Sequence, residues 1–284
     1  MCRFVAYLGK KPLLLNDVLG EPENSLINQS KHAKDGALGL NADGFGLGWY
    51  NHEIDNIPGV FKSIQPAWND LNLHNIVTKV KSTCFLGHVR SATMGDVNIF
   101  NSHPFAYNKF LFVHNGTIHE FDNIKRQLLT ILSDEMFSTI KGQTDSEYLF
   151  ALLMDNFYRK KIMVSVQDLS EIVEKSIDQL IMMQKQLTKA AFSKINSVLT
   201  NGKTLIATRY VSDDIHPSLS LYYSVQKSIK DGDKHVESII ISSEPLTDCV
   251  NKWIEIPPNH MFLVDETLNF TLKPIVLAHE KIMR

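Results

Sequence analysis

The hydrophobic and polar residues in the first third of this chain follow a pattern of short strands. Apolar segments rich in aromatic and β-branched residues are separated by turn residues, which is typical of β structure. We expect strands at residues 3–8, 45–50, 84–90 and 110–113. The first of these strands is expected to end at Gly9 and the Lys-Lys-Pro that follows it.

The middle of the chain has helical periodicity instead. Apolar residues recur at offsets of four, one and three at Ile124, Leu128, Leu129 and Leu132. The segment Thr144-Asp145-Ser146-Glu147 has the form of a capping box, and it precedes an apolar run at 148–157. An apolar stripe over residues 166–184 predicts a further helix, and we interpret this stripe as core packing.

The last third returns to the strand pattern. We expect strands at 204–211, 219–225, 236–242, 260–264 and 270–275, with tight turns at Asn201-Gly202 and Asp231-Gly232-Asp233. Strands, then helices, then strands again predict an α+β protein in which helices cover the sheets. Because no internal repeat, low-complexity tract or long flexible linker interrupts the chain, we expect one domain over residues 1–284.

Composition and charge narrow the functional classes. The 284 residues are 44% hydrophobic, which is enough for a substantial core. A net charge of −2 without a block of Lys and Arg argues against nucleic acid as a partner. No segment approaches the roughly 20 apolar residues that cross a bilayer, and the N-terminus does not resemble a signal peptide. Three widely spaced cysteines do not suggest a disulfide framework, so we expect a cytoplasmic protein with no membrane partner.

Cys2 is the first candidate for chemistry. Once Met1 is removed, a terminal cysteine carries its own general base, because an α-amino group has a pKa of about 7.7–8.0 and a thiol one near 8.5. Nucleophile and base then belong to one residue, and no separate histidine is required. The alternative is that Cys2 is merely a new terminus exposed by removal of the methionine.

An oxyanion hole and two charged residues could complete such a site. The Asn115 side-chain amide and the Gly116 backbone N–H are suitable oxyanion donors, each typically worth about 3 kcal/mol of barrier. An ordinary Asn-Gly turn that closes a hairpin is the alternative. Arg90, at the end of an expected strand, could clamp a carboxylate, and Asp145 could bind an ammonium group. Taken alone, Arg90 could equally form a surface ion pair, and Asp145 could be an acidic residue of a first helical turn.

Other chemistries fit the sequence less well. No dinucleotide-binding loop is expected, because no helix follows the alternating glycines of the segment 44–48. Cys84 and Cys249 are interpreted as buried small hydrophobic residues. We expect no metal and no other cofactor, because no recognised ligand pair occurs among His88, His103, His114 and His119.

Six motifs follow one another along the chain. They are Met-Cys-Arg-Phe at 1–4, Asp-Gly-Phe-Gly-Leu-Gly-Trp-Tyr at 43–50, Gly-His-Val-Arg-Ser-Ala-Thr at 87–93, Asn-Ser-His-Pro-Phe at 101–105, His-Asn-Gly at 114–116 and Thr-Asp-Ser-Glu at 144–147. In this order they resemble the N-terminal-cysteine (class II) glutamine amidotransferase family. Ser-Ser-Glu-Pro-Leu-Thr at 242–247, with Trp253 and Pro257-Pro258, resembles a free-standing branch. That branch includes the γ-glutamyl hydrolase of ergothioneine biosynthesis and the amidotransferase-like subunit of fungal glutathione degradation.

This resemblance implies a fold and a set of roles. The implied fold is the four-layer αββα sandwich of the N-terminal nucleophile hydrolases. Cys2 would be the nucleophile, and Asn115 and Gly116 would form the oxyanion hole. We assign Arg90, Thr93 and Asp145 to binding of a γ-glutamyl substrate.

The rest of the chain leaves little room for a synthase domain, so we expect hydrolysis of a γ-glutamyl amide. The reaction would pass through a Cys2 thioester and release glutamate. One alternative is an ammonia-delivering glutaminase subunit of a larger complex, and another is a non-catalytic protein that binds γ-glutamyl metabolites. Ser91 stands where biosynthetic relatives often carry an aromatic residue. The substrate, and with it the leaving group, therefore stays open between glutamine, a γ-glutamyl peptide and a γ-glutamyl amine. The sequence also leaves open a protein partner or a homo-oligomer.

Overall fold

The computed structural model describes residues 1–34, 40–92, 94–160, 165–188, 192–230, 233–249 and 251–279, so Asp231 and Gly232 of the second expected turn lie outside the described residues. Within these ranges the strands form two antiparallel sheets, one of seven strands and one of six. The seven-stranded sheet contains, in spatial order, β11 (Ile254–Glu255), β9 (Tyr222–Lys230), β10 (Asp233–Ser242), β1 (Arg3–Leu14), β4 (Lys81–Val89), β2 (Phe45–Trp49) and β3 (Gly59–Ser63). The six-stranded sheet contains β13 (Phe270–Pro274), β12 (His260–Val264), β8 (Leu205–Val211), β7 (Ser193–Thr200), β6 (Phe110–Ile118) and β5 (Phe105–Tyr107).

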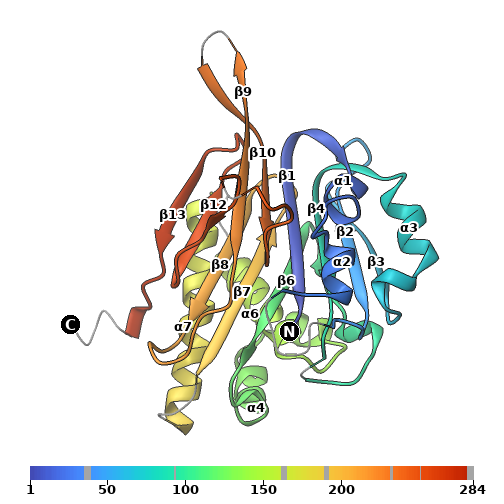
Figure 1. Cartoon of the computed structure of the whole chain (residues 1–284). Helices are drawn as coiled ribbons and strands as arrows, with labels where there is room; N and C mark the ends of the chain where they lie inside the picture. The colour runs from blue at the N-terminus through green and yellow to red at the C-terminus, as the bar shows by residue number, and fades with distance from the viewer. Residues whose placement is uncertain are drawn as a thin grey trace.

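Helices cover the outer face of each sheet (Figure 1). Against the seven-stranded sheet lie α1 (Asn16–Leu19), α2 (Leu26–Lys31), α3 (Leu71–Val77) and the short 3-10 helix η1 (Ala67–Asn69). Against the six-stranded sheet lie α4 (Phe121–Ile131), α5 (Asp134–Thr139), α6 (Asp145–Lys160) and α7 (Val166–Leu187). A second 3-10 helix, η2, spans Ile99–Asn101. No helix in the described part of the chain is long and apolar enough to cross a membrane.

Three hydrophobic cores separate these four layers, and the strand pleat assigns residues to them. In β1, Phe4 and Ala6 face the core between the two sheets, whereas Val5 packs under α1 and α2. In β6, Leu111 faces the core between the sheets and Phe112 faces α6. Alternating residues thus enter two different cores, because successive side chains of a strand point to opposite faces. The four-layer α+β sandwich expected from the sequence is confirmed.

Two of the expected strands run further than predicted. β1 does not end at Gly9 but continues to Leu14, with a register shift between Leu8 and Leu13 where it pairs with β4. β6 does not end at residue 113 but continues through the His-Asn-Gly motif to Ile118. The hairpin-turn alternative for this motif is therefore wrong, because all three residues are paired with β7.

The expected turn at Asn201-Gly202 is confirmed and joins β7 to β8. Gly202 has a φ of +87°, which only glycine adopts without strain. The Asn201 side-chain oxygen accepts the backbone N–H groups of Lys203 at 3.0 Å and Thr204 at 2.8 Å. This side-chain bonding to the backbone two residues on is the usual way in which asparagine stabilises a turn.

Candidate active site

Cys2 lies directly before β1, the central strand of the seven-stranded sheet. β1 pairs with β4 so that Arg3 is opposite Val89, and this register brings Cys2 next to Ser91. The Ser91 N–H donates to the Cys2 sulfur at 3.4 Å, and the thiol donates to the Ser91 carbonyl oxygen at 3.4 Å. The sheet register therefore fixes the thiol beside the end of β4.

Burial raises the pKa of the Cys2 thiol above its ordinary value. The Ser91 N–H, the positive charge of the amino terminus and the Arg90 guanidinium oppose this shift, whereas Asp145 adds to it. A thiol with a raised pKa stays protonated at neutral pH, so attack by Cys2 requires a base that takes the proton. Among the hydrogen bonds of the described residues, none joins this thiol to a histidine ring.

Arg90 follows β4 immediately and is nearly fully buried. Its guanidinium donates to the backbone carbonyl oxygens of Met94 at 2.9 Å, Gly95 at 3.2 Å and Asp96 at 3.0 Å. Its own backbone N–H donates to the Gly44 carbonyl at 2.8 Å. Arg90 makes no ion pair with any carboxylate of the described residues, so the surface-ion-pair alternative is wrong.

Asp145 is the first residue of α6, and its carboxylate ties this helix to the end of β6. The carboxylate accepts the Ile118 backbone N–H at 2.8 Å and the Ser146 backbone N–H at 2.8 Å. Because a carboxylate offers about four acceptor positions, Asp145 can still accept hydrogen bonds from a ligand.

Only half of the expected capping box forms at the start of α6. The Thr144 hydroxyl accepts the Glu147 backbone N–H at 3.3 Å, as predicted. The Glu147 carboxylate does not turn back to Thr144; it accepts the backbone N–H groups of Lys141 at 2.9 Å and Gly142 at 2.7 Å. Glu147 therefore fixes the loop before the helix, which positions Asp145 from the other side.

Cys2, Arg90, Gly116 and Asp145 line one narrow cavity, which we call the Arg90 cavity. Its volume of about 20 Å³ is room for about one water molecule, so the cavity must widen to admit a glutamyl group. It brings together a thiol, a buried cation and a carboxylate, which are the groups that a nucleophilic site for a zwitterionic substrate needs. His103 and His114 also line it.

Asn115 and Gly116 are adjacent in β6 and lie on opposite faces of the strand. A Cβ atom at position 116 would lie 1.9 Å from the Lys194 carbonyl oxygen, so β7 approaches too closely for any residue but glycine. Asn115 lines a different pocket, on the Met1 side of Cys2. Among the described residues its side-chain amide has no hydrogen-bond partner, so it is available to a ligand.

Three expectations about single residues have different outcomes. Thr93 lies outside the described residues, and its role in substrate binding stays a prediction. Cys84 is fully buried, as expected, and burial raises the pKa of its thiol to about 12. Cys249, expected to be buried, is exposed instead, because it lies in the loop after β10 rather than in a strand.

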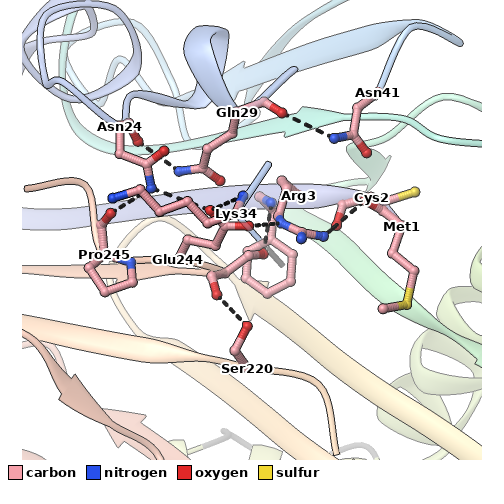
Figure 2. Close-up of polar contacts among 12 residues, drawn as sticks. Met1, Cys2, Arg3, Asn24, Gln29, Lys34, Asn41, Ser220, Glu244 and Pro245 are labelled. Carbon is pink, nitrogen blue, oxygen red and sulfur yellow. Dashed lines mark hydrogen bonds and ion pairs between the residues drawn. The ribbon is translucent and has the colours of Figure 1, made fainter. Parts of the chain in front are cut away.

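Sequence reasoning missed the pairing of Arg3 with Glu244. The Arg3 Nε contacts the Glu244 Oε1 at 2.6 Å, and both side chains are buried. Figure 2 shows that the Arg3 guanidinium also donates to the carbonyl oxygens of Met1, at 2.9 Å, and Cys2, at 3.0 Å. Glu244 further accepts the Asn24 amide at 3.3 Å and the Lys34 backbone N–H at 3.1 Å. This cluster holds the backbone of the nucleophile; its only signal in the sequence was the Ser-Ser-Glu motif at 242–244.

Three histidines are buried at the Arg90 cavity: His103 and His114 line it, and His88 stacks on His103. The rings of His88 and His103 stack with centroids 4.1 Å apart, and the nitrogens of both have no hydrogen-bond partner in the described structure. Burial lowers the pKa of His88 to about 3 and that of His103 well below its ordinary range, and it also lowers that of His114. Among the described residues, no three His, Cys, Asp or Glu side chains are grouped to hold a metal ion.

Comparison with known proteins agrees with this geometry. The sequence is similar to a probable glutamine amidotransferase of Saccharomyces cerevisiae, DUG3, with 33% identity covering 97% of this chain and 85% of that protein. It is also similar to the gamma-glutamyl-hercynylcysteine sulfoxide hydrolase of Mycolicibacterium smegmatis, with 25% identity covering 92% of this chain and 94% of that protein. A glutamine aminotransferase class-II domain protein from Silicibacter pomeroyi superposes with a TM-score of 0.70 and 26% identity, covering 98% of this chain and 100% of that one.

The family assignment rests on most of the chain. Residues 22–274 match the sequence model of the class-II glutamine amidotransferases, and the similarity to the yeast protein extends over nearly the whole sequence. The fold is that of the N-terminal nucleophile amidotransferases. The chain belongs to the class-II glutamine amidotransferase family of enzymes.

Proposed function

We propose that this chain hydrolyses γ-glutamyl amides, with Cys2 as the nucleophile after removal of Met1. The observation that carries the proposal is the Arg90 cavity, which is lined by the thiol, a buried cation and a fixed carboxylate. A γ-glutamyl group carries an α-carboxylate and an α-ammonium, which match Arg90 and Asp145 in charge. The similarity to a γ-glutamyl hydrolase supports the same substrate class.

Arg90 suits the α-carboxylate because its guanidinium has no carboxylate partner among the described residues. A bidentate bond to the substrate would replace weaker donation to the carbonyl oxygens of residues 94–96. Asp145 would accept from the α-ammonium while its bonds to β6 keep it in place. Together the two residues would orient the γ-carbonyl toward the Cys2 sulfur.

The reaction begins with transfer of the thiol proton to the α-amino group of Cys2. The sulfur attacks the γ-carbonyl carbon, and the resulting oxyanion accepts hydrogen bonds from the Asn115 amide and the Gly116 N–H. The C–N bond breaks, and the leaving amine takes the proton from the α-ammonium of Cys2. Water then attacks the thioester, which releases glutamate and restores the thiol. The raised pKa of the thiol supports the need for this adjacent base.

Two further parts belong to the proposal. The family match over residues 22–274 supports a single domain over the chain, with no separate synthase part. Three free cysteines support a reducing compartment such as the cytoplasm.

The test is glutamate release from a panel of γ-glutamyl compounds by protein whose loss of Met1 has been verified by intact mass. Wild type should release glutamate, and Cys2→Ala should not. Cys2→Ser keeps the shape of the side chain but supplies a poorer nucleophile, so it serves as the matched control. An acid-quenched sample should contain wild-type protein heavier by one glutamyl group.

Three outcomes would contradict this proposal. Active enzyme that retains Met1 would rule out the α-amine as the base. Binding without turnover would indicate a non-catalytic protein, and turnover of glutamine only with a copurifying protein would indicate an ammonia-delivering subunit.

A further inference from the structure

A second pocket opens on the Met1 side of Cys2, and we call it the Met1 pocket. Its volume is about 340 Å³, which falls in the range of small-molecule sites, whereas the Arg90 cavity has about 20 Å³. It is lined by Met1, Arg3, Asn115, Lys194, Arg209 and Glu255, together with residues 217–220. The two spaces share β6 as a wall, with Asn115 on one side and Gly116 on the other.

We propose that the Met1 pocket binds the leaving group of the substrate, and that it selects an amine bearing a carboxylate, such as an amino acid or a peptide. This inference rests on the proposed γ-glutamyl hydrolysis. It deepens that function by naming the chemical class of the half of the substrate that Arg90 and Asp145 do not contact.

The position of the proton donor favours the Met1 pocket as the site of the leaving group. The leaving amine takes its proton from the α-ammonium of Cys2, so it must depart on the side of that group. The α-nitrogen of Cys2 forms the peptide bond to Met1, so the position of Met1 shows the direction in which this nitrogen points. Since Met1 lines the pocket, we expect removal of Met1 to expose the α-amino group of Cys2 to the same space.

The position of the oxyanion donor Asn115 favours the same pocket. Asn115 lines the Met1 pocket and has no side-chain hydrogen bond among the described residues. A carbonyl that spans from the Arg90 cavity to Asn115 would place its glutamyl carbon chain in the first space and its nitrogen substituent in the second. The sizes agree with this division, because the larger space serves the more variable half of the substrate.

The charges of the lining residues favour a leaving group that carries a carboxylate. Arg3 is paired with Glu244, and Arg209 is paired with Glu255 at 2.8 Å. Arg209 also donates to the carbonyl oxygens of Leu219, at 2.7 Å, and Ile256, so its guanidinium is occupied. Lys194 makes no ion pair with any described residue, so no carboxylate of the described residues balances its positive charge in this pocket. A carboxylate on the leaving group would balance this charge.

The neighbourhood of Lys194 keeps it beside the reacting groups. It lies in β7 opposite Thr117 of β6, and its carbonyl oxygen faces Gly116. Lys194 is therefore held by the same pair of strands that carries the oxyanion donors. A lysine at this position can reach a leaving group while β7 itself stays fixed.

Turnover of matched substrates tests the selection. We would compare γ-glutamylglycine and γ-glutamylglycylglycine, each with its C-terminal amide. Wild type should favour the free carboxylates in kcat/KM by roughly tenfold, the effect of one hydrogen bond to a charged group at a partly exposed site. Lys194→Gln should remove this preference, and Lys194→Arg should retain most of it. Lys203→Gln makes the same charge change in the exposed turn at the far end of β7, and it should leave the preference as in wild type.

Binding of the product gives a readout that does not depend on turnover. Processed Cys2→Ser protein should bind glycylglycine roughly tenfold more tightly than glycylglycinamide in calorimetry, and Lys194→Gln should abolish the difference. A binding difference without any turnover would support the pocket and refute the hydrolase. Turnover with equal use of acids and amides would refute the pocket and leave the hydrolase standing. If Lys194→Gln lowered kcat/KM by the same factor for the free carboxylates and for their amides, that result would also overturn the proposal.

Discussion

The two arginines that flank Cys2 are buried to the same degree but differ in how their charges are balanced. Arg3 is 2% exposed and contacts the Glu244 carboxylate at 2.6 Å. Arg90 is 3% exposed and donates only to backbone carbonyl oxygens among the described residues. A buried charge without a counter-ion is costly, and an anionic ligand relieves that cost. Arg3 therefore serves the folded state, and Arg90 suits a ligand.

The largest expected effect comes from breaking the first pair. Arg3→Met leaves the Glu244 carboxylate buried without its cation, which should lower the free energy of unfolding by about 3–5 kcal/mol. Chemical denaturation would measure this loss. Adding Glu244→Gln should recover a large part of it, because the amide oxygen can still accept from Asn24 and the backbone of Lys34. If the double variant were as unstable as Arg3→Met, the ion pair would not be the source of the loss.

The second effect should appear in catalysis rather than in stability. Arg90→Gln removes the charge that binds the substrate carboxylate, so kcat/KM for γ-glutamyl compounds should fall by roughly two orders of magnitude, or about 2.7 kcal/mol. Its free energy of unfolding should fall by less than that of Arg3→Met, because no buried carboxylate is left alone. Arg90→Lys keeps the positive charge but cannot make the bidentate bond of a guanidinium, so its kcat/KM should lie between those of wild type and Arg90→Gln. Equal destabilisation by Arg3→Met and Arg90→Gln would remove the distinction between the two arginines.

The third effect is the smallest at neutral pH, because it develops only in acid: buried histidines on the Arg90 side make the stability depend on pH. The pKa of His88 is lowered to about 3 in the fold and is about 6.5 in an unfolded chain. Between these values the unfolded state binds one more proton, so stability is complete above pH 6.5 and falls as the pH decreases toward 3. The slope is about 1.4 kcal/mol per pH unit for this residue, and His103 adds to it in the same direction.

Denaturation at a series of pH values would measure this slope. The matched control is His88→Phe, since neither ring nitrogen of His88 has a partner among the described residues. The free energy of unfolding of this variant should decrease less steeply as the pH falls, by about 1.4 kcal/mol per pH unit. At neutral pH it should change little. An unchanged slope would show that His88 is not the group that titrates.

Strands whose two faces both enter apolar cores, such as β1 and β4, were predicted from the sequence. β7 was not predicted, because Lys194, Asn196 and Ser197 interrupt its apolar pattern. Asn196 is nevertheless fully buried, and its amide donates to the carbonyl oxygens of Leu219, at 3.3 Å, and Ser220, at 2.9 Å. A buried polar residue whose amide donates to a distant segment cannot be told from a loop residue by periodicity.

The residues of the candidate site also differ in whether the sequence alone could identify them. Cys2, Arg90 and Asp145 could be selected because each lies in a short motif whose chemistry is visible locally. The pairing of Arg3 with Glu244 could not, because it depends on β10 lying beside β1, and these strands come from opposite ends of the chain. The sequence likewise could not separate the faces of β6, since a strand was expected to end before Asn115.

Gly116 has a consequence for the evolution of proteins with this fold. Its lack of a side chain is demanded by the carbonyl oxygen of Lys194, which belongs to the neighbouring strand and not to the reaction. A descendant that had lost its activity would be released from selection on Arg90, but its sheet would still exclude every larger residue at position 116. Gly116 would therefore be retained after the activity was lost. Genome surveys that seek inactive descendants should examine Arg90 and disregard Gly116.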